Sequence, residues 1–175
     1  VNFYASEAGL FTVDRAAIDA INAVDPAITI ATLPEFSAVE EGRMLATVKI
    51  IPFAVAAALV ERAAAVAEGR RALVLHPFAP RDVGLVQTVL PSVKESVLDK
   101  TSRLTAERLS RSGSRITHEQ RVPHEAGDVA AALAELAPRN GLVVVFGASA
   151  VSDGEDVIPA AIRLAGGRVE RVGMP

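Results

Sequence analysis

The chain contains no cysteine and no tryptophan, and few of its 175 residues are aromatic. Without cysteine, the protein forms neither disulfide bonds nor thiolate metal sites, and it has no thiol nucleophile. One tyrosine and six phenylalanines offer few platforms on which nucleic acid bases could stack. The formal net charge of −3 also lacks the basic excess of nucleic-acid-binding domains. We therefore expect a cytoplasmic protein with a small-molecule ligand and no nucleic acid partner.

The sequence also lacks a hydrophobic run long enough to cross a membrane. The longest apolar run, 50–60, holds eleven residues and includes Pro52, whereas a transmembrane helix needs roughly 18 or more. The chain begins at Val1 without a basic leader or a cleavage pattern. We expect no membrane partner. Because the chain starts without Met and stops just after a strand-like segment, we expect it to be an interior piece of a longer protein.

Half of the residues are apolar, which is enough for a sizeable core. Two prolines in 77–81 mark a boundary, since the residue before a proline is biased away from helix. We predict a smaller α+β accessory region over residues 1–78 and an α/β domain over residues 79–175. The expected elements of the first region are strands at 3–5, 11–13, 28–33 and 45–51, a helix at 16–23 capped by Asp14, and a helix at 54–67.

Strands and helices alternate in the second region. The expected strands are 83–87, 115–119, 142–146 and 168–172, and the expected helices are about 100–112, 126–136 and 157–165. This alternation implies right-handed crossovers and a mostly parallel sheet that helices cover on both faces. In such a three-layer α/β/α domain, ligands bind beyond the carboxyl ends of the strands. Here these ends are 87–88, 120–125 and 147–156.

The strand at 142–146 leads into a turn of small side chains and then into a helix. The candidate binding residues along this path are Gly147, Ala148, Ser149, Ala150, Val151, Ser152, Asp153 and Asp156. Small side chains let a ligand approach the backbone, and a helix N-terminus carries roughly half a positive charge. The pattern suits an anion, with serine hydroxyls as donors. A plain strand-to-helix turn with Asp156 as its N-cap explains it as well.

Residues 82–175 resemble the molybdopterin-binding domain shared by proteins that build and insert the molybdenum cofactor. That family has a Gly-Gly-Thr-Gly type loop followed by an Asp and a helix, and 147–150 and Asp156 correspond to these features. The stretch from 151 to 175 resembles one stand-alone bacterial branch in particular. The resemblance implies a molybdopterin-binding-like fold, molybdopterin as the ligand, a homo-oligomer, and a role in molybdenum cofactor biosynthesis or handling.

One further segment takes its expected role from this resemblance. Asp99, Lys100 and Thr101 correspond to an Asp-Ser-Asn type segment that opens the first helix of the family. Lys100 would bring a positive charge to a phosphate, whereas Asp99 alone is typical of a helix N-cap. Thr88 ends the first strand, where the family has Gly-Asp-Glu in place of the Gln-Thr-Val-Leu-Pro at 87–91. His124 is one histidine in a loop, which usually is only solvated.

Asp153 and Asp156 are candidate ligands for Mg²⁺, because this hard cation prefers carboxylate oxygens and can bridge them to a phosphate. Ala148 and Ala150 replace family glycines and restrict positive φ, which favours binding over catalysis. Three functions stay open at this point. They are a carrier, chaperone or sensor of the pterin phosphate; a Mg²⁺-dependent adenylyl- or molybdenum-transferase; and a structural module or nucleotide-metabolism relative on the same fold.

Overall fold

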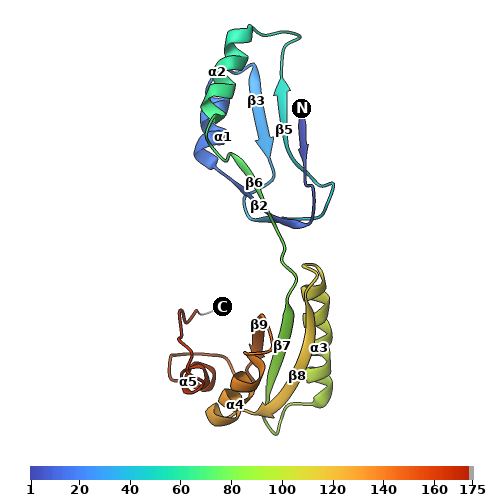
Figure 1. Ribbon diagram of the computed structural model, residues 1–175, viewed down its shortest axis with the longest axis vertical. Helices are drawn as coiled ribbons and strands as arrows, with labels where there is room; N and C mark the ends of the chain where they lie inside the picture. Colours follow the sequence, from blue (N-terminus) through green and yellow to red (C-terminus); the bar gives the residue numbers. More distant parts are fainter. Residues whose placement is uncertain (174–175) are drawn as a thin grey trace. The chain divides into compact units, whose positions relative to one another are not determined.

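A computed structural model describes residues 1–173 of the chain. The chain divides into two compact units, Val1–Phe78 and Ala79–Pro175 (Figure 1). The described residues form five helices and three small sheets, of which one is parallel, so the protein is mixed α/β. Among residues 1–173, none of the helices has both the length and the apolar character of a bilayer-spanning segment.

The first unit contains two antiparallel sheets and two helices. One sheet has the order β1-β5-β3, from β1 (Asn2–Tyr4), β5 (Met44–Ile50) and β3 (Ile28–Thr32). The other has the order β4-β2-β6, from β4 (Ser37–Val39), β2 (Gly9–Val13) and β6 (Leu73–Pro77). The helices are α1 (Arg15–Asn22) and α2 (Ala57–Ala67).

Local sequence patterns predicted the two helices of the first unit, whereas two strands that pair over long sequence separations were not predicted. The predicted cap is confirmed, because the Asp14 carboxylate accepts a hydrogen bond of 3.1 Å from the backbone N–H of Ala17. Strands β4 and β6 were not predicted. Both pair with β2 across long sequence separations, and the pairing partner rather than local composition makes them strands. Helix α2 begins at Ala57, three residues later than predicted.

The second unit is built around a parallel sheet of three strands. Its elements in chain order are β7 (Asp82–Val89), α3 (Glu95–Ser110), β8 (Arg115–Pro123), α4 (Ala126–Leu136), β9 (Leu142–Phe146) and α5 (Val157–Leu164). The strand order is β8-β7-β9, so β7 is the central strand and both of its neighbours run parallel to it. The prediction of a parallel sheet in this unit is confirmed.

Side chains of β7 alternate between two helices. Val86 packs against Ala132 and Leu136 of α4. Gly84 lies on the same side, where a Cβ atom would stand only 3.2 Å from the Cβ of Leu136. Gln87 points the other way and donates to the backbone carbonyl of Leu98 in α3. Because successive residues of a strand face opposite sides, α4 contacts one face of the sheet and α3 the other.

The fourth predicted strand, 168–172, does not form. Helix α5 ends with Gly166 at a φ of 81°, and the N–H of Gly167 donates to the carbonyl of Ile162 at 2.8 Å. This is a Schellman ending, which turns the chain sharply away from the helix axis. The chain that follows carries three charged residues at 168, 170 and 171, and Arg168 pairs with Glu170 instead of a neighbouring strand. Within the described residues, β9 is therefore an edge strand.

We predict that Leu136→Ala destabilises the second unit by about 2–5 kcal/mol, because truncation of a buried leucine loses apolar contacts and leaves a cavity. Leu136 is 1% exposed. The matched control is Leu164→Ala, which removes a leucine that is 67% exposed and should cost less than about 0.5 kcal/mol. Hydrogen exchange read by mass spectrometry in a urea series would follow each unit separately. Equal losses in the two variants would contradict the described core.

Candidate functional site at the carboxyl ends of the parallel strands

The three parallel strands end at one edge of the sheet, and the chain leaves them in different directions. After β7 it continues into α3, which contacts one face of the sheet. After β9 it continues into α5, whose Ala161 packs with Val129 and Ala130 of α4 on the other face. The crevice between β7 and β9 is thus a topological switch point, which is where parallel α/β sheets bind ligands.

A chain of hydrogen bonds joins all three strand ends at this point. The Thr88 hydroxyl lies 2.8 Å from Nδ1 of His124, and Nε2 of His124 lies 2.9 Å from the Ser149 hydroxyl. The backbone N–H of Ala148 donates to the same Thr88 hydroxyl at 2.7 Å. Thr88 is buried and Ser149 is exposed, so the chain of contacts runs from the interior to the surface.

The turn after β9 depends on a glycine at its first position. A Cβ atom on Gly147 would stand 3.0 Å from the carbonyl oxygen of Ser149 and 3.8 Å from the His124 ring. Neither Ala148 nor Ala150 adopts a positive φ, which agrees with the restriction expected of alanine at these positions. The turn therefore tolerates both alanines, and Ala150 and Ser152 remain exposed beside Ser149.

The Asp156 carboxylate binds the backbone of the loop that precedes it. Asp156 is the N-cap residue of α5, as predicted, but its side chain makes no capping hydrogen bond to the helix. Its Oδ2 accepts from the backbone N–H groups of Ser152 and Asp153 instead. These two donors, helped by the nearby His124 ring, lower the pKa of Asp156 below its ordinary value. The first N–H groups of α5 are therefore not occupied by this carboxylate, and they carry the positive end of the helix dipole.

Asp99, Lys100 and Thr101 do not open a helix. Helix α3 begins at Glu95, whose carboxylate suits the positive end of the helix, so the predicted start was five residues late. Asp99 lies in the second turn and accepts from Arg121 at 2.7 Å, and Thr101 donates to the carbonyl of Val97. Lys100 is exposed. No hydrogen bond or ion pair within the described chain connects this segment with the loop after β9.

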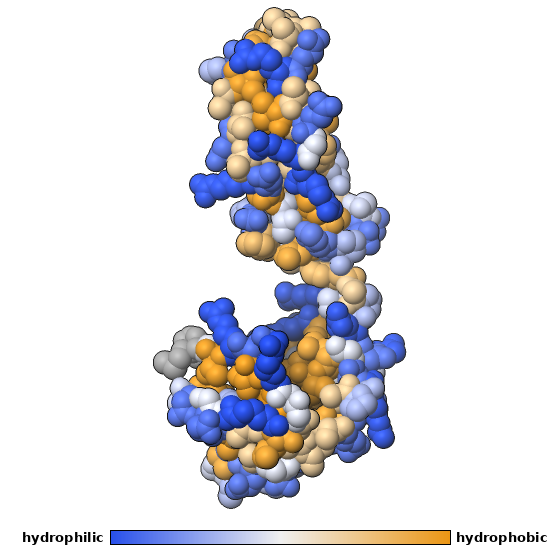
Figure 2. All heavy atoms as spheres, turned by 60° about the vertical axis from the view of Figure 1, so that its left-hand side comes forward, coloured by the Kyte–Doolittle hydropathy of each residue, from blue (hydrophilic) through white to orange (hydrophobic). Residues whose placement is uncertain are grey.

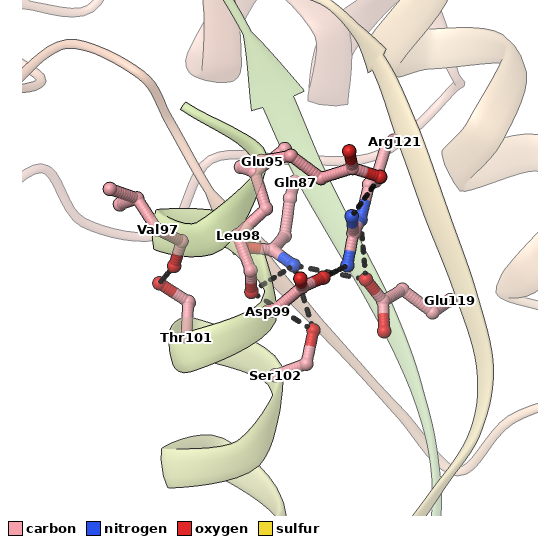
Figure 3. A network of polar contacts seen from close by, with 9 residues as sticks. All are labelled: Gln87, Glu95, Val97, Leu98, Asp99, Thr101, Ser102, Glu119 and Arg121. Atoms are coloured by element: carbon pink, nitrogen blue, oxygen red, sulfur yellow. Dashed lines mark hydrogen bonds and ion pairs between the residues drawn. The ribbon is translucent and has the colours of Figure 1, made fainter. Parts of the chain in front are cut away.

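Asp99 belongs to a polar network between α3 and the sheet (Figure 3). Arg121 on β8 contacts three carboxylates, those of Glu95, Asp99 and Glu119. Gln87, which is 1% exposed, donates to Glu119 at 3.1 Å and to Ser102 at 2.9 Å. Burial alone would raise the pKa of Glu119, but hydrogen bonds from Ser102, Arg121 and Gln87 outweigh it and lower the pKa. The network satisfies the buried Gln87 amide and fastens α3 to the sheet.

The sequence-based interpretation underestimated the number of contacts that His124 makes. It was taken as a solvated loop histidine, yet both ring nitrogens lie within hydrogen-bond distance of hydroxyl groups. The signal that points to it is topological, because it directly follows β8, just as Thr88 and Ser149 lie at the ends of β7 and β9. Strand ends of a parallel sheet converge, and their polar residues therefore belong to one site.

Asp153 and Asp156, the predicted Mg²⁺ ligands, both lie in the loop before α5 or at its N-cap. Within residues 1–173, no three or more His, Asp or Glu side chains are grouped as they would be around a metal ion. Asp153 uses Oδ1 to accept from the N–H of Glu155 at 2.7 Å, and Asp156 uses Oδ2. One oxygen of each carboxylate has no hydrogen-bond partner among the described residues. Oxygen of this kind is what Mg²⁺ prefers, and binding of Mg²⁺ by these two residues stays a prediction.

Comparison of the chain with protein-family models, with curated proteins and with solved structures found no match. The resemblance to molybdopterin-binding domains therefore stays a prediction. The observations that bear on function are the three converging strand ends, the hydrogen bonds that join them, and the N-terminus of α5.

We predict that the loop 152–156 loosens at acid pH. Asp156 has a lowered pKa in the folded protein, so its stabilising contribution is complete above the ordinary aspartate pKa of about 3.9. This contribution is lost as the pH falls through the lowered value. Carbon-detected NMR of the Asp156 carboxyl should show a midpoint below 3.9, with the amide signals of Ser152 and Asp153 moving in step. A midpoint at or above the ordinary value would contradict the two backbone hydrogen bonds.

Proposed function

We propose that the chain binds molybdopterin, or a molybdenum cofactor precursor, through its phosphate at the strand ends of the second unit. In this proposal the second unit is a three-layer domain of the molybdopterin-binding type. The supporting observation is the set of hydrogen bonds from Thr88 through His124 to Ser149, which joins three strand ends beside the N-terminus of α5.

The donors at this edge suit a phosphate. The exposed Ser149 and Ser152 hydroxyls can donate to anionic oxygens, and the first N–H groups of α5 add the positive end of a helix dipole. Hydrogen bonds to charged groups are stronger than those between neutral groups. The loop after β9 is also held in place before any ligand arrives, because Asp156 and Thr88 fix its backbone. A fixed loop loses less conformational entropy when a ligand binds.

Binding has more support than catalysis. Two backbone donors hold the pKa of the Asp156 carboxylate below its ordinary value, and a carboxylate stabilised in this way is a weak base. Both nitrogens of His124 already contact hydroxyl groups. A Mg²⁺-dependent transferase is the alternative, and one observation favours it. Two carboxylates beside a phosphate site would repel the ligand, and a shared cation would remove that repulsion.

We predict that Ser149→Leu lowers the affinity for molybdopterin by at least about tenfold, because leucine removes a donor to a charged ligand and adds bulk at the exposed turn. The matched control is Ser96→Leu, an exposed position on α3, which should leave the affinity unchanged. Anaerobic calorimetry measures both, and circular dichroism reports whether each variant is folded. The proposal is wrong if the folded Ser149→Leu variant binds as tightly as the parent chain.

A separate prediction concerns the dependence of ligand binding on Mg²⁺. If Asp153 and Asp156 share Mg²⁺ with the ligand phosphate, EDTA should weaken binding and added Mg²⁺ should restore it, because the carboxylates then repel the phosphate. The same calorimetric titration with Asp153→Asn should lose this dependence on Mg²⁺. Identical affinities with and without EDTA would remove the cation from the proposal and leave the helix N-terminus and hydroxyl groups as the anion's partners.

A further inference from the structure

The first unit contains an apolar cleft that is independent of the site at the strand ends. Its volume is about 590 Å³, and it lies between the two helices and the β1-β5-β3 sheet. Ile21 of α1, Ile30 of β3 and Val48 of β5 line it, together with Ala63 and Ala67 of α2. Ligand pockets of proteins commonly have volumes of about 300–1,000 Å³ and mostly apolar walls, so the cleft has the size and character of a small-molecule site.

The cleft exists because α2 faces the sheet with alanines. Ala63, Ala64 and Ala67 line it at helical spacing, and their methyl groups are too short to fill the space in front of the sheet. Larger apolar side chains stand at the mouth instead, where Phe3 is 43% and Val60 is 46% exposed. Figure 2 shows apolar side chains at the surface of this unit, bordered by hydrophilic ones. Exposed apolar surface of this kind marks ligand or partner sites.

Two arginines give the cleft a charged end. Arg70 and Arg71 line it just beyond the C-terminus of α2. Both are exposed, and within residues 1–173 their guanidinium groups form no ion pair or side-chain hydrogen bond. The residues that line the cleft include no aspartate or glutamate. An apolar wall with two guanidinium groups at one end is complementary to a molecule that has an apolar body and an anionic head.

We propose that this cleft binds an aliphatic carboxylate. The hydrocarbon chain lies against Ile30, Val48 and the alanines of α2, and the carboxylate pairs with Arg70 and Arg71. Charge decides between this occupant and a second copy of the protein. The lining offers no carboxylate, and a second copy that presented the same lining would bring two more arginines to the cleft, whereas a carboxylate ligand pairs both guanidinium groups.

Decanoate and the neutral alcohol 1-decanol test the proposal on the whole chain. Each is titrated against the fluorescence of bound anilinonaphthalene sulfonate, itself an apolar anion. Decanoate should displace the dye and bind at least about tenfold more tightly than decanol, the ratio expected for a charge-assisted contact. The double variant Arg70→Ala with Arg71→Ala should bring the two affinities within about twofold of each other.

A substitution that fills the cleft distinguishes binding in the cleft from binding to other apolar surface. Ala64→Leu should weaken decanoate and decanol alike, because the leucine occupies the space. The matched control is Ala58→Leu on α2, at an exposed position that does not line the cleft, and it should bind both as the parent does. Ser149→Leu should also leave decanoate binding unchanged, which distinguishes this proposal from the one at the strand ends.

Three results would overturn the proposal. The first is decanoate that fails to displace the dye, and the second is equal binding of decanoate and decanol by the parent chain. The third is a dimer in light scattering that Ala64→Leu converts to monomer, since a second copy would then cover the cleft. Thermal unfolding of each variant shows whether it is folded, and the arginine variant changes only exposed side chains.

Discussion

The second unit depends on the burial of β7. This strand has a neighbour on each edge and a helix on each face, so its polar side chains must find partners inside the unit. Its last buried positions are Gln87 and Thr88, which face opposite sides because strand residues alternate. The Gln87 amide ties the strand to α3 and β8, and the Thr88 hydroxyl ties it to His124 and to the turn after β9. The burial of β7 thus accounts for both the polar network and the candidate site.

Periodicity in the sequence was sufficient for most of the second unit, because it is a local property. The helix at 126–136 was predicted with its observed bounds, and so was the strand at 142–146. The expected strand at 168–172 does not form, and the periodicity of the sequence could not have indicated this. A strand forms only where a neighbouring edge accepts its hydrogen bonds, and here the Schellman ending of α5 turns the chain before a run of charged residues.

The candidate site was only partly accessible to sequence reasoning. The rule that ligands bind at strand ends selected Thr88 and Ser149, which the structure brings to the two sides of one histidine ring. The rule does not say which side chains meet, and these contacts span 36 and 25 residues. Asp99 was misassigned because its position was judged from an assumed helix start. The observed start is earlier, which places Asp99 on the helix surface that faces Arg121.

The side chains of Thr88, His124 and Ser149 form a continuous chain of contacts, and the position of the imidazole proton sets the direction of each hydrogen bond. A neutral imidazole carries one proton, so the ring has two arrangements. If Nδ1 holds the proton, it donates to Thr88, and Nε2 accepts the hydroxyl proton of Ser149. If Nε2 holds it, the ring donates to Ser149, Thr88 donates to Nδ1, and the Ser149 proton is free to point outward. The oxygen of the buried Thr88 hydroxyl accepts from the Ala148 N–H in either case, so among the described residues its own proton has an acceptor only when it donates to Nδ1. The second arrangement is thus the one that the buried threonine favours, and it also directs the Ser149 proton toward the surface, where the proposed anion would bind.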